Sequence, residues 1–242
     1  MKSYRDLIEQ TFEFPTREFN VDDDHNLQFN NVPLIDIIKQ YGTPLKLTYL
    51  PKIGEHIEQA RLMFRNAIKK FNYKGSYTYC YCTKSSHFRF ILEEALDYNA
   101  HLETSSAYDI PIIRQLYNEG KLTKQTYIIC NGYKDEEFIE LALLAQKMGK
   151  EIFLVVEKLN ELKLIKTVAE RNNVRPNIGI RIKLTNSGSG KWEESGGDQS
   201  KFGLNASELL EAIEFARENN LLDCVNMIHF HLGSQITNIR RI

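Results

Sequence analysis

The chain has 242 residues and a formal net charge of −1, from 31 basic and 32 acidic side chains. This balance argues against a nucleic-acid-binding protein or a polybasic membrane-surface protein, and a hydrophobic fraction of 42% argues against disorder. No apolar run has the length of a signal peptide core or a membrane span, so the sequence predicts a cytoplasmic protein.

Short apolar runs alternate with amphipathic windows along the chain, as strands and helices do when they follow one another. The predicted strands are 44–50, 76–82, 101–104, 125–130, 151–157, 177–184 and 224–232. The predicted helices are 53–71, 88–98, 107–120, 135–149, 160–173 and 206–220, with Asp135 and Ser207 as expected N-caps. This order predicts parallel strands joined by helical crossovers, and the most apolar runs predict strands buried on both faces.

Two folds fit this pattern, a closed (β/α)8 barrel and an open doubly wound sheet. No G-x-G-x-x-G follows a strand, which lowers the expectation of a nucleotide-binding open sheet. Only six regular units follow residue 75, whereas a closed barrel has eight. Either the sheet is open or the chain is a fragment. The predicted strand 44–50 does not share the regular spacing and is expected to belong to a different sheet.

The stretch GSYTYCYCTKSSHF, Gly75 to Phe88, ends a predicted strand on a lysine. Alternation places Thr78, Cys80, Cys82 and Lys84 on one face and three tyrosines on the other. In a barrel the first face lines the interior, so we expect Lys84 to be desolvated. Desolvation favours the neutral, nucleophilic amine that imine formation requires. The alternative is a lysine that snorkels from the strand end or pairs with an acid.

Further polar residues fall at the carboxyl ends of other predicted strands. Glu103 and Arg181 lie toward the ends of two of them. His231 lies at the end of a third, and Gly233 and Ser234 just beyond that strand could offer a backbone N–H and a hydroxyl to a phosphate. An ordinary turn is the alternative for the last two residues. Because the carboxyl ends of parallel strands meet at one edge, we expect these side chains and Lys84 to converge in an active site.

Metal binding is weakly indicated. His229 and His231 share a strand face and could bind zinc, but no third ligand stands at a suitable spacing. The four cysteines include no C-x-x-C pair and are expected to be buried, reduced thiols. The sequence therefore predicts no metal site.

The segment 185–203 is rich in glycine and serine and contains the only tryptophan. It follows a predicted strand directly. It is either a surface insertion or a loop that covers an active site at the carboxyl ends of the strands.

Several of these motifs resemble one enzyme family. YCYCTKSS and HFHLGSQ resemble the lysine and histidine-glycine-serine motifs of the alanine-racemase-like, fold type III pyridoxal-phosphate decarboxylases. RIKLTNSGSGKWEESGGDQSKFGLN resembles the loop of the biosynthetic arginine decarboxylases within that family, and YIICNGYKDEEFIELA is also similar. The resemblance spans roughly residues 40 to 237 and implies a (β/α)8 TIM-type barrel, here incomplete with about six of eight units.

The resemblance implies roles for the residues that match the family motifs. Lys84 corresponds to the lysine that holds pyridoxal phosphate as an internal aldimine, and His231 to the residue that stacks on the cofactor ring. Gly233 and Ser234 correspond to the phosphate contact. Glu103 matches the acidic position near the cofactor.

Arg181 matches the arginine that approaches the ring hydroxyl side. The chain departs from the family at Ser85-Ser86, where a small apolar residue and asparagine or a similar residue are usual. Family members extend well beyond Ile242, so we expect an N-terminal fragment. Residues 1–50 would then carry a strand of a largely missing β-domain, and residues 51–242 would form a partial pyridoxal-phosphate-binding barrel.

The function implied is decarboxylation of L-arginine to agmatine and carbon dioxide in polyamine and spermidine biosynthesis. The implied cofactor is pyridoxal phosphate, joined by magnesium in some members, and the implied assembly is a homodimer or higher homo-oligomer. We expect little or no activity from this fragment alone. The alternatives are a decarboxylase of diaminopimelate or another basic amino acid, a non-catalytic pyridoxal-phosphate-binding homologue, and a barrel fragment without cofactor.

Overall fold

The computed structural model describes residues 18–184 and 201–232. The chain divides into two compact units, Met1–Tyr49 and Leu50–Ile242. No helix within the described ranges is long and apolar enough to cross a membrane.

The first unit is a small antiparallel sheet with one helix. Strands β1 (Phe19–Val21), β2 (Leu27–Phe29) and β3 (Val32–Pro33) pair in that order, and α2 (Leu34–Tyr41) follows. The rings of Phe19 and Phe29 meet edge to face at 4.9 Å. The predicted strand 44–50 is wrong, because these residues pair with none of the three strands and form no ladder. Its assignment to a β-domain stays a prediction.

The second unit alternates strands and helices after one long helix, α3 (Pro51–Phe71). The elements that follow are β4 (Cys80–Cys82), α4 (Arg89–Asp97), β5 (His101–Thr104), α5 (Asp109–Asn118), β6 (Tyr127–Cys130), α6 (Glu136–Lys147), β7 (Glu151–Val156), α7 (Leu159–Asn172), β8 (Ile178–Arg181), α8 (Ala206–Glu218), the short 3-10 helix η2 (Leu222–Cys224) and β9 (Val225–His229).

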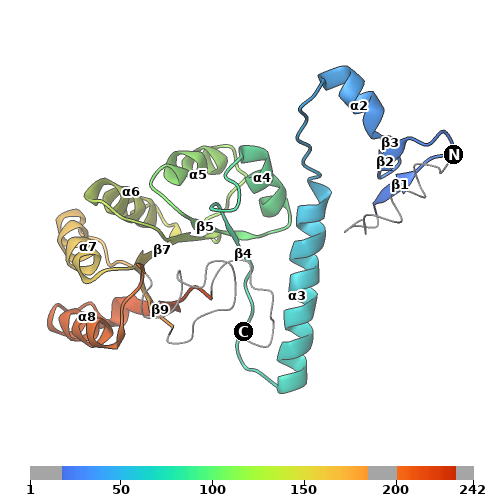
Figure 1. Ribbon diagram of the computed structural model, residues 1–242. Coiled ribbons are helices and arrows are strands. Elements are labelled where there is room, and N and C mark those ends of the chain that lie inside the picture. Colours follow the sequence, from blue (N-terminus) through green and yellow to red (C-terminus); the bar gives the residue numbers. More distant parts are fainter. Residues whose placement is uncertain (1–17, 185–200, 233–242) are drawn as a thin grey trace. The chain divides into compact units, whose positions relative to one another are not determined.

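The six strands of this unit form one parallel sheet in strictly sequential order, from β4 to β9. Helices α5 to α8 follow one another along the same side of the sheet (Figure 1). A doubly wound sheet reverses its strand order and carries helices on both faces, whereas a barrel adds each strand beside the last. The predicted fold class is therefore confirmed: the described residues form six strands and the five α-helices between them, part of an incomplete (β/α) barrel.

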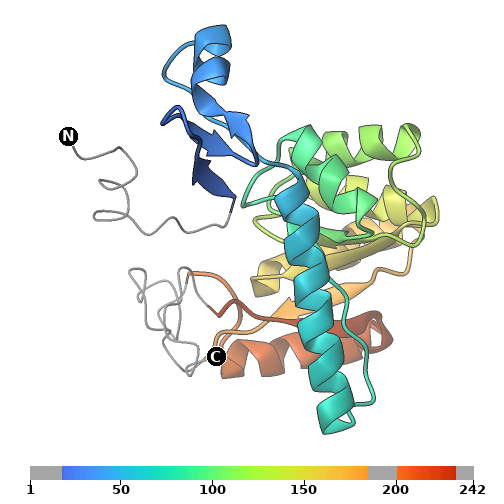
Figure 2. The same cartoon turned by 90° about the vertical axis from the view of Figure 1, so that its right-hand side faces the viewer.

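Apolar residues of the strands and crossover helices make the core. Leu102, Ile128, Leu154 and Ile178 belong to one buried cluster with residues of α4 to α8, among them Phe138. In β6 and β7, successive residues are buried, which confirms that these strands are covered on both faces. Helix α3 packs against α4 through a separate cluster that contains Ile57, Ala95 and Ala100 (Figure 2).

One of the two predicted helix caps is confirmed. The Asp135 carboxylate accepts a hydrogen bond of 2.9 Å from the backbone N–H of Phe138 at the start of α6. The prediction for Ser207 is wrong, because Asn205 caps α8 instead. Its side chain accepts from the N–H of Glu208, and the Glu208 carboxylate accepts from the N–H of Asn205 in return.

Candidate active site

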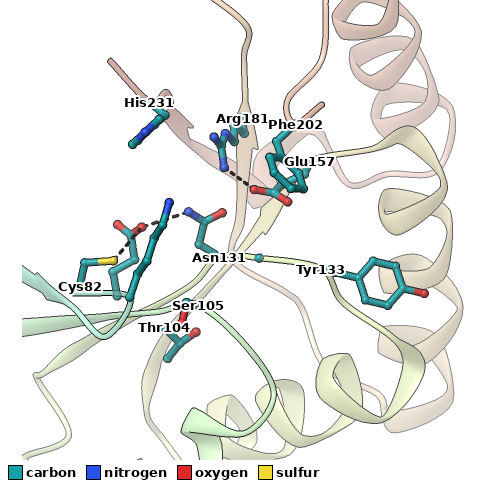
Figure 3. Close-up of a pocket in the computed structure, with 12 residues that line it drawn as sticks. Cys82, Thr104, Ser105, Asn131, Tyr133, Glu157, Arg181, Phe202 and His231 are labelled. Atoms are coloured by element: carbon teal, nitrogen blue, oxygen red, sulfur yellow. Dashed lines mark hydrogen bonds and ion pairs between the residues drawn. The ribbon is translucent and has the colours of Figure 1, made fainter. Parts of the chain in front are cut away.

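A cavity of about 580 Å3 opens at the carboxyl ends of the parallel strands (Figure 3). Each strand contributes a side chain from its last residues or from the turn that follows. In strand order these are Cys82, Glu103, Asn131, Glu157, Arg181 and His231. This edge is where parallel barrels place their reactive groups.

The structure brings four of the predicted site residues together. Lys84, Glu103, Arg181 and His231 all line this cavity, although they lie far apart in the sequence. Gly233 and Ser234 lie outside the described residues. Of the predicted covering loop 185–203, only the end is described, and there Phe202 lines the cavity.

Lys84 differs from its prediction in one respect. Strand β4 ends at Cys82, so Lys84 stands in the turn beyond it and is exposed at the cavity mouth instead of desolvated within the strand. Among the described residues of this unit, the lysine that is buried is Lys134. Burial lowers the pKa of Lys134, with Glu161 and Glu157 acting in the opposite direction.

Glu103 is the centre of a hydrogen-bonded cluster on the cavity wall. Its Oε1 accepts a bond of 3.0 Å from Asn131 Nδ2 and lies 3.7 Å from His229 Nε2 and 3.9 Å from Cys82 Sγ. Burial acts to raise the pKa of Glu103, but the neighbouring His229, the hydrogen bond from Asn131 and the charge of Arg181 outweigh it and leave the pKa lowered. Glu103 is therefore an ionised carboxylate at neutral pH.

Arg181 is held by a second carboxylate. Its guanidinium forms a largely buried ion pair with Glu157, and it lies 5.5 Å from the centre of the Phe202 ring. Figure 3 shows the Arg181 and Glu157 side chains meeting beside the ring. The pair balances the charge of Arg181, whose side chain still lines the cavity.

His231 lines the cavity just after β9, on a different side from Cys82 and Thr104 (Figure 3). Desolvation lowers the pKa of His231, and the nearby charges of Arg181, Lys84 and His229 lower it further. Its imidazole is therefore neutral at pH 7, with an uncharged flat face. Burial and the Glu103 charge together raise the pKa of Cys82, so this thiol stays protonated.

The sequence reasoning missed Asn131 and Glu157. Both follow apolar strands directly, so the rule that selected Glu103 would also have selected them. Cys80, Cys82, Cys130 and Cys224 are free thiols, but Cys80 and Cys82 are only half buried. Across the described ranges, no three His, Cys, Asp or Glu side chains are grouped to hold a metal ion.

Comparisons with known proteins place this geometry in context. Residues 55–242 match the model of the family described as pyridoxal-dependent decarboxylase, pyridoxal binding domain. The biosynthetic arginine decarboxylase of Bacteroides thetaiotaomicron is 48% identical over 209 residues, which are 85% of this chain and 32% of that protein. That of Pasteurella multocida is 39% identical over 193 residues, or 79% and 30% of the two chains.

Solved structures agree in fold. The biosynthetic arginine decarboxylase of Campylobacter jejuni superposes with a TM-score of 0.73 at 33% identity, over 93% of this chain and 38% of that chain. Diaminopimelate decarboxylase of M. jannaschii has a TM-score of 0.74 at 20% identity, over 93% and 50%, and shows the fold alone. The chain thus spans about a third of the length of the curated relatives it matches. Because the family model matches most of its residues, this chain belongs to the pyridoxal-dependent decarboxylases.

Proposed function

We propose that the protein decarboxylates L-arginine to agmatine and carbon dioxide with pyridoxal phosphate as its cofactor. The observation that carries the proposal is the convergence of Lys84, Glu103, Arg181 and His231 on one cavity in a chain of this family. The choice of arginine rests on relatives named biosynthetic arginine decarboxylases, at 38 to 48% identity. The resemblance of the motifs leads us to propose a homodimer or higher homo-oligomer as well.

The cavity offers groups that fit pyridoxal phosphate. Lys84 is an accessible primary amine for an aldehyde, and Lys84 and Arg181 are cations for its anionic oxygens. Asn131 Oδ1 is buried at the cavity wall without a hydrogen-bond partner from the described residues. Buried polar atoms normally have a partner, so this oxygen is an acceptor to which a bound molecule can donate.

Pyridoxal phosphate supplies, when bound, an electron-poor ring that accepts the electron pair of the breaking bond between Cα and the carboxylate. The residues of the chain bind the cofactor and orient it. Lys84 provides the anchoring amine, and the neutral His231 offers a flat face for the ring. Arg181, held by its ion pair with Glu157, presents its positive charge to the cavity, and Glu103 remains an anion. We assign Gly233 and Ser234 to the phosphate.

The substrate proposal is tested with the protein at its full natural length. L-arginine labelled at the carboxyl carbon is expected to release labelled carbon dioxide together with an equal amount of agmatine. Diaminopimelate, L-lysine and L-ornithine at the same concentration serve as comparisons. Faster release from one of these three than from arginine would contradict the proposed substrate.

Lys84→Ala tests the anchoring amine. We expect the visible absorbance of the lysine-bound cofactor to disappear and decarboxylation to fall by about three orders of magnitude, since the covalent anchor is lost. Lys163→Ala removes an exposed lysine of α7 and is the control, with absorbance and turnover as in the parent protein. A Lys84→Ala variant that keeps both would refute the assignment.

A further inference from the structure

The turn that carries Lys84 is fastened to its surroundings from both sides. Residues 83–85 form a turn directly after β4, and the Lys84 side chain itself is exposed. A long, exposed lysine can reach a bound carbonyl reproducibly only if its backbone is held in place. Hydrogen bonds made by the residues next to Lys84 hold this backbone in place.

The first set of hydrogen bonds joins the buried residues Thr83 and Asp109. Thr83 has no exposed surface, and its hydroxyl donates a hydrogen bond of 2.8 Å to Asp109 Oδ2. The same carboxylate oxygen accepts from the backbone N–H groups of Ser105 at 2.8 Å and Ser106 at 3.2 Å, and lies 3.3 Å from the Ser105 hydroxyl. Asp109 thus joins the turn after β4 to the turn after β5.

Asp109 is an unusual residue for this position. It is 4% exposed, and no lysine or arginine forms an ion pair with it in the described part of the chain. A buried carboxylate without a cation requires several strong donors, and here they come from two different segments. The Thr83 N–H also donates to the Glu103 carbonyl at 2.9 Å, which ties Thr83 to β5 by its backbone too.

The second set of hydrogen bonds involves Ser85, one of the residues at which the chain departs from the family pattern. The Ser85 hydroxyl lies 2.9 Å from the Cys82 carbonyl and 3.0 Å from the hydroxyl of Tyr81. Tyr81 in turn donates to the carbonyl of Ser86 at 3.0 Å. Lys84 is therefore flanked by two residues whose side chains are both hydrogen-bonded.

We propose that Thr83 and Asp109 are positioning residues for Lys84, and that Ser85 and Tyr81 complete the hold on its turn. This inference rests on the proposed function, because it holds that the hydrogen-bonded turn 83–85 positions Lys84 Nζ to react with the cofactor carbonyl. Thr83 and Asp109 contact neither substrate nor cofactor in this scheme. They act by restricting the backbone from which the amine extends.

Two variants and a rescue test the inference in the full-length protein. Thr83→Val keeps the shape of the side chain and removes its hydroxyl, Asp109→Asn removes the charge, and Thr83→Ser restores the hydroxyl. Thr167→Val, on the exposed face of α7, is the matched control. Ile165→Val in the core of α7 controls for a general loss of stability.

The first readout needs no cofactor. Hydrogen exchange of the backbone amides of residues 83–86 is expected to become about tenfold faster in Thr83→Val and Asp109→Asn, with the rest of the barrel unchanged. Thr83→Ser and both controls are expected to exchange like the parent protein. Equal exchange in all variants would overturn the proposal. If Thr83→Val does not fold, Asp109→Asn carries the same comparison.

The second readout is the rate at which pyridoxal phosphate becomes attached to Lys84. Borohydride reduction after short incubation fixes the cofactor, and the mass of the Lys84 peptide measures it. We expect about tenfold slower attachment in Thr83→Val and recovery in Thr83→Ser. Unchanged attachment in Thr83→Val overturns the positioning role. Absence of any Lys84 adduct in the parent protein instead overturns the proposed function, while hydrogen exchange still decides whether the fastening exists.

Discussion

Single side chains at the strand ends differ in how their charges are balanced. Glu103 accepts a hydrogen bond from the neutral amide of Asn131 and lies 3.7 Å from His229, whereas Glu157 pairs directly with a guanidinium. The sequence allowed Lys84, Glu103, Arg181 and His231 to be selected, because strand ends are visible as the limits of apolar runs. It could not show which carboxylate would face Arg181, since that depends on the spacing between neighbouring strands.

The Arg181–Glu157 pair supports a prediction at this scale. Both side chains are largely buried, so removal of one charge leaves the other desolvated. Glu157→Ala is expected to lower the free energy of unfolding by about 3–5 kcal/mol, and Glu157→Gln by less because the amide can still accept a hydrogen bond. Equilibrium chemical denaturation measures both differences.

The control is the exposed pair of Glu136 and Arg171, whose atoms lie 2.5 Å apart. Solvent screens such a pair, so Glu136→Gln is expected to change the free energy of unfolding by less than about 1 kcal/mol. If Glu157→Gln were no more harmful than Glu136→Gln, the buried pair would not be holding Arg181.

Secondary structure elements were predicted correctly where the apolar pattern was long. Every crossover helix from α4 to α8 lies within two residues of its predicted range at each end, and β5 agrees fully. The prediction failed for segments whose structure depends on hydrogen bonding to a neighbouring strand. Residues 76–79 alternate like β4 but lie outside it, and the short strands β1 to β3 have too few residues for a period. A segment forms a strand only where a neighbouring strand hydrogen-bonds to it, and sequence periodicity does not show whether such a strand is present.

The turn after β6 illustrates the same dependence and yields a prediction. Gly132 lines the cavity with a φ of 82°, and a Cβ atom there would lie 2.1 Å from the Ser105 carbonyl oxygen. Gly132→Ala therefore adds a backbone clash to the strain of positive φ. We expect it to lower the free energy of unfolding by more than about 2 kcal/mol.

Gly120 provides the matched comparison for this variant. It also has a positive φ, 74°, but a Cβ atom there would meet open space. Gly120→Ala is expected to lower the free energy of unfolding by only about 1 kcal/mol, from backbone strain alone. The difference between the two variants, measured by denaturation, isolates the close approach of the turns after β5 and β6. Equal losses would show that Ser105 moves away freely.

At the scale of the whole unit, sequential strand order decides between the two folds that the sequence left open. Each right-handed crossover in a sequentially ordered sheet leaves its helix on the same side, so that side becomes the outside of a barrel. The other side then collects one side chain from each strand end in a single cavity. Residue-level convergence of Lys84 with His231 is thus a consequence of topology.

The same topology leaves β9 as an edge strand of the described sheet. On its outward face Ile228 is 69% exposed, and Phe230, just after the strand, is 50% exposed. Unpaired N–H and C=O groups next to exposed apolar side chains favour pairing with another sheet. We therefore expect a polypeptide of these 242 residues, expressed by itself, to self-associate, as seen by size-exclusion chromatography and by binding of an apolar dye.

Ile228→Lys tests whether the edge is responsible. A charge on an edge strand opposes edge-to-edge pairing, so this variant is expected to shift the polypeptide toward the monomer and to reduce dye binding severalfold. Leu210→Lys is the matched control, because Leu210 is 71% exposed on α8, where the backbone bonds are satisfied within the helix. If both substitutions reduced association equally, exposed apolar area in general would be the cause. A selective effect of Ile228→Lys identifies the open edge of β9, because Leu210 lies on a helix and Ile228 lies on an edge strand of the described sheet.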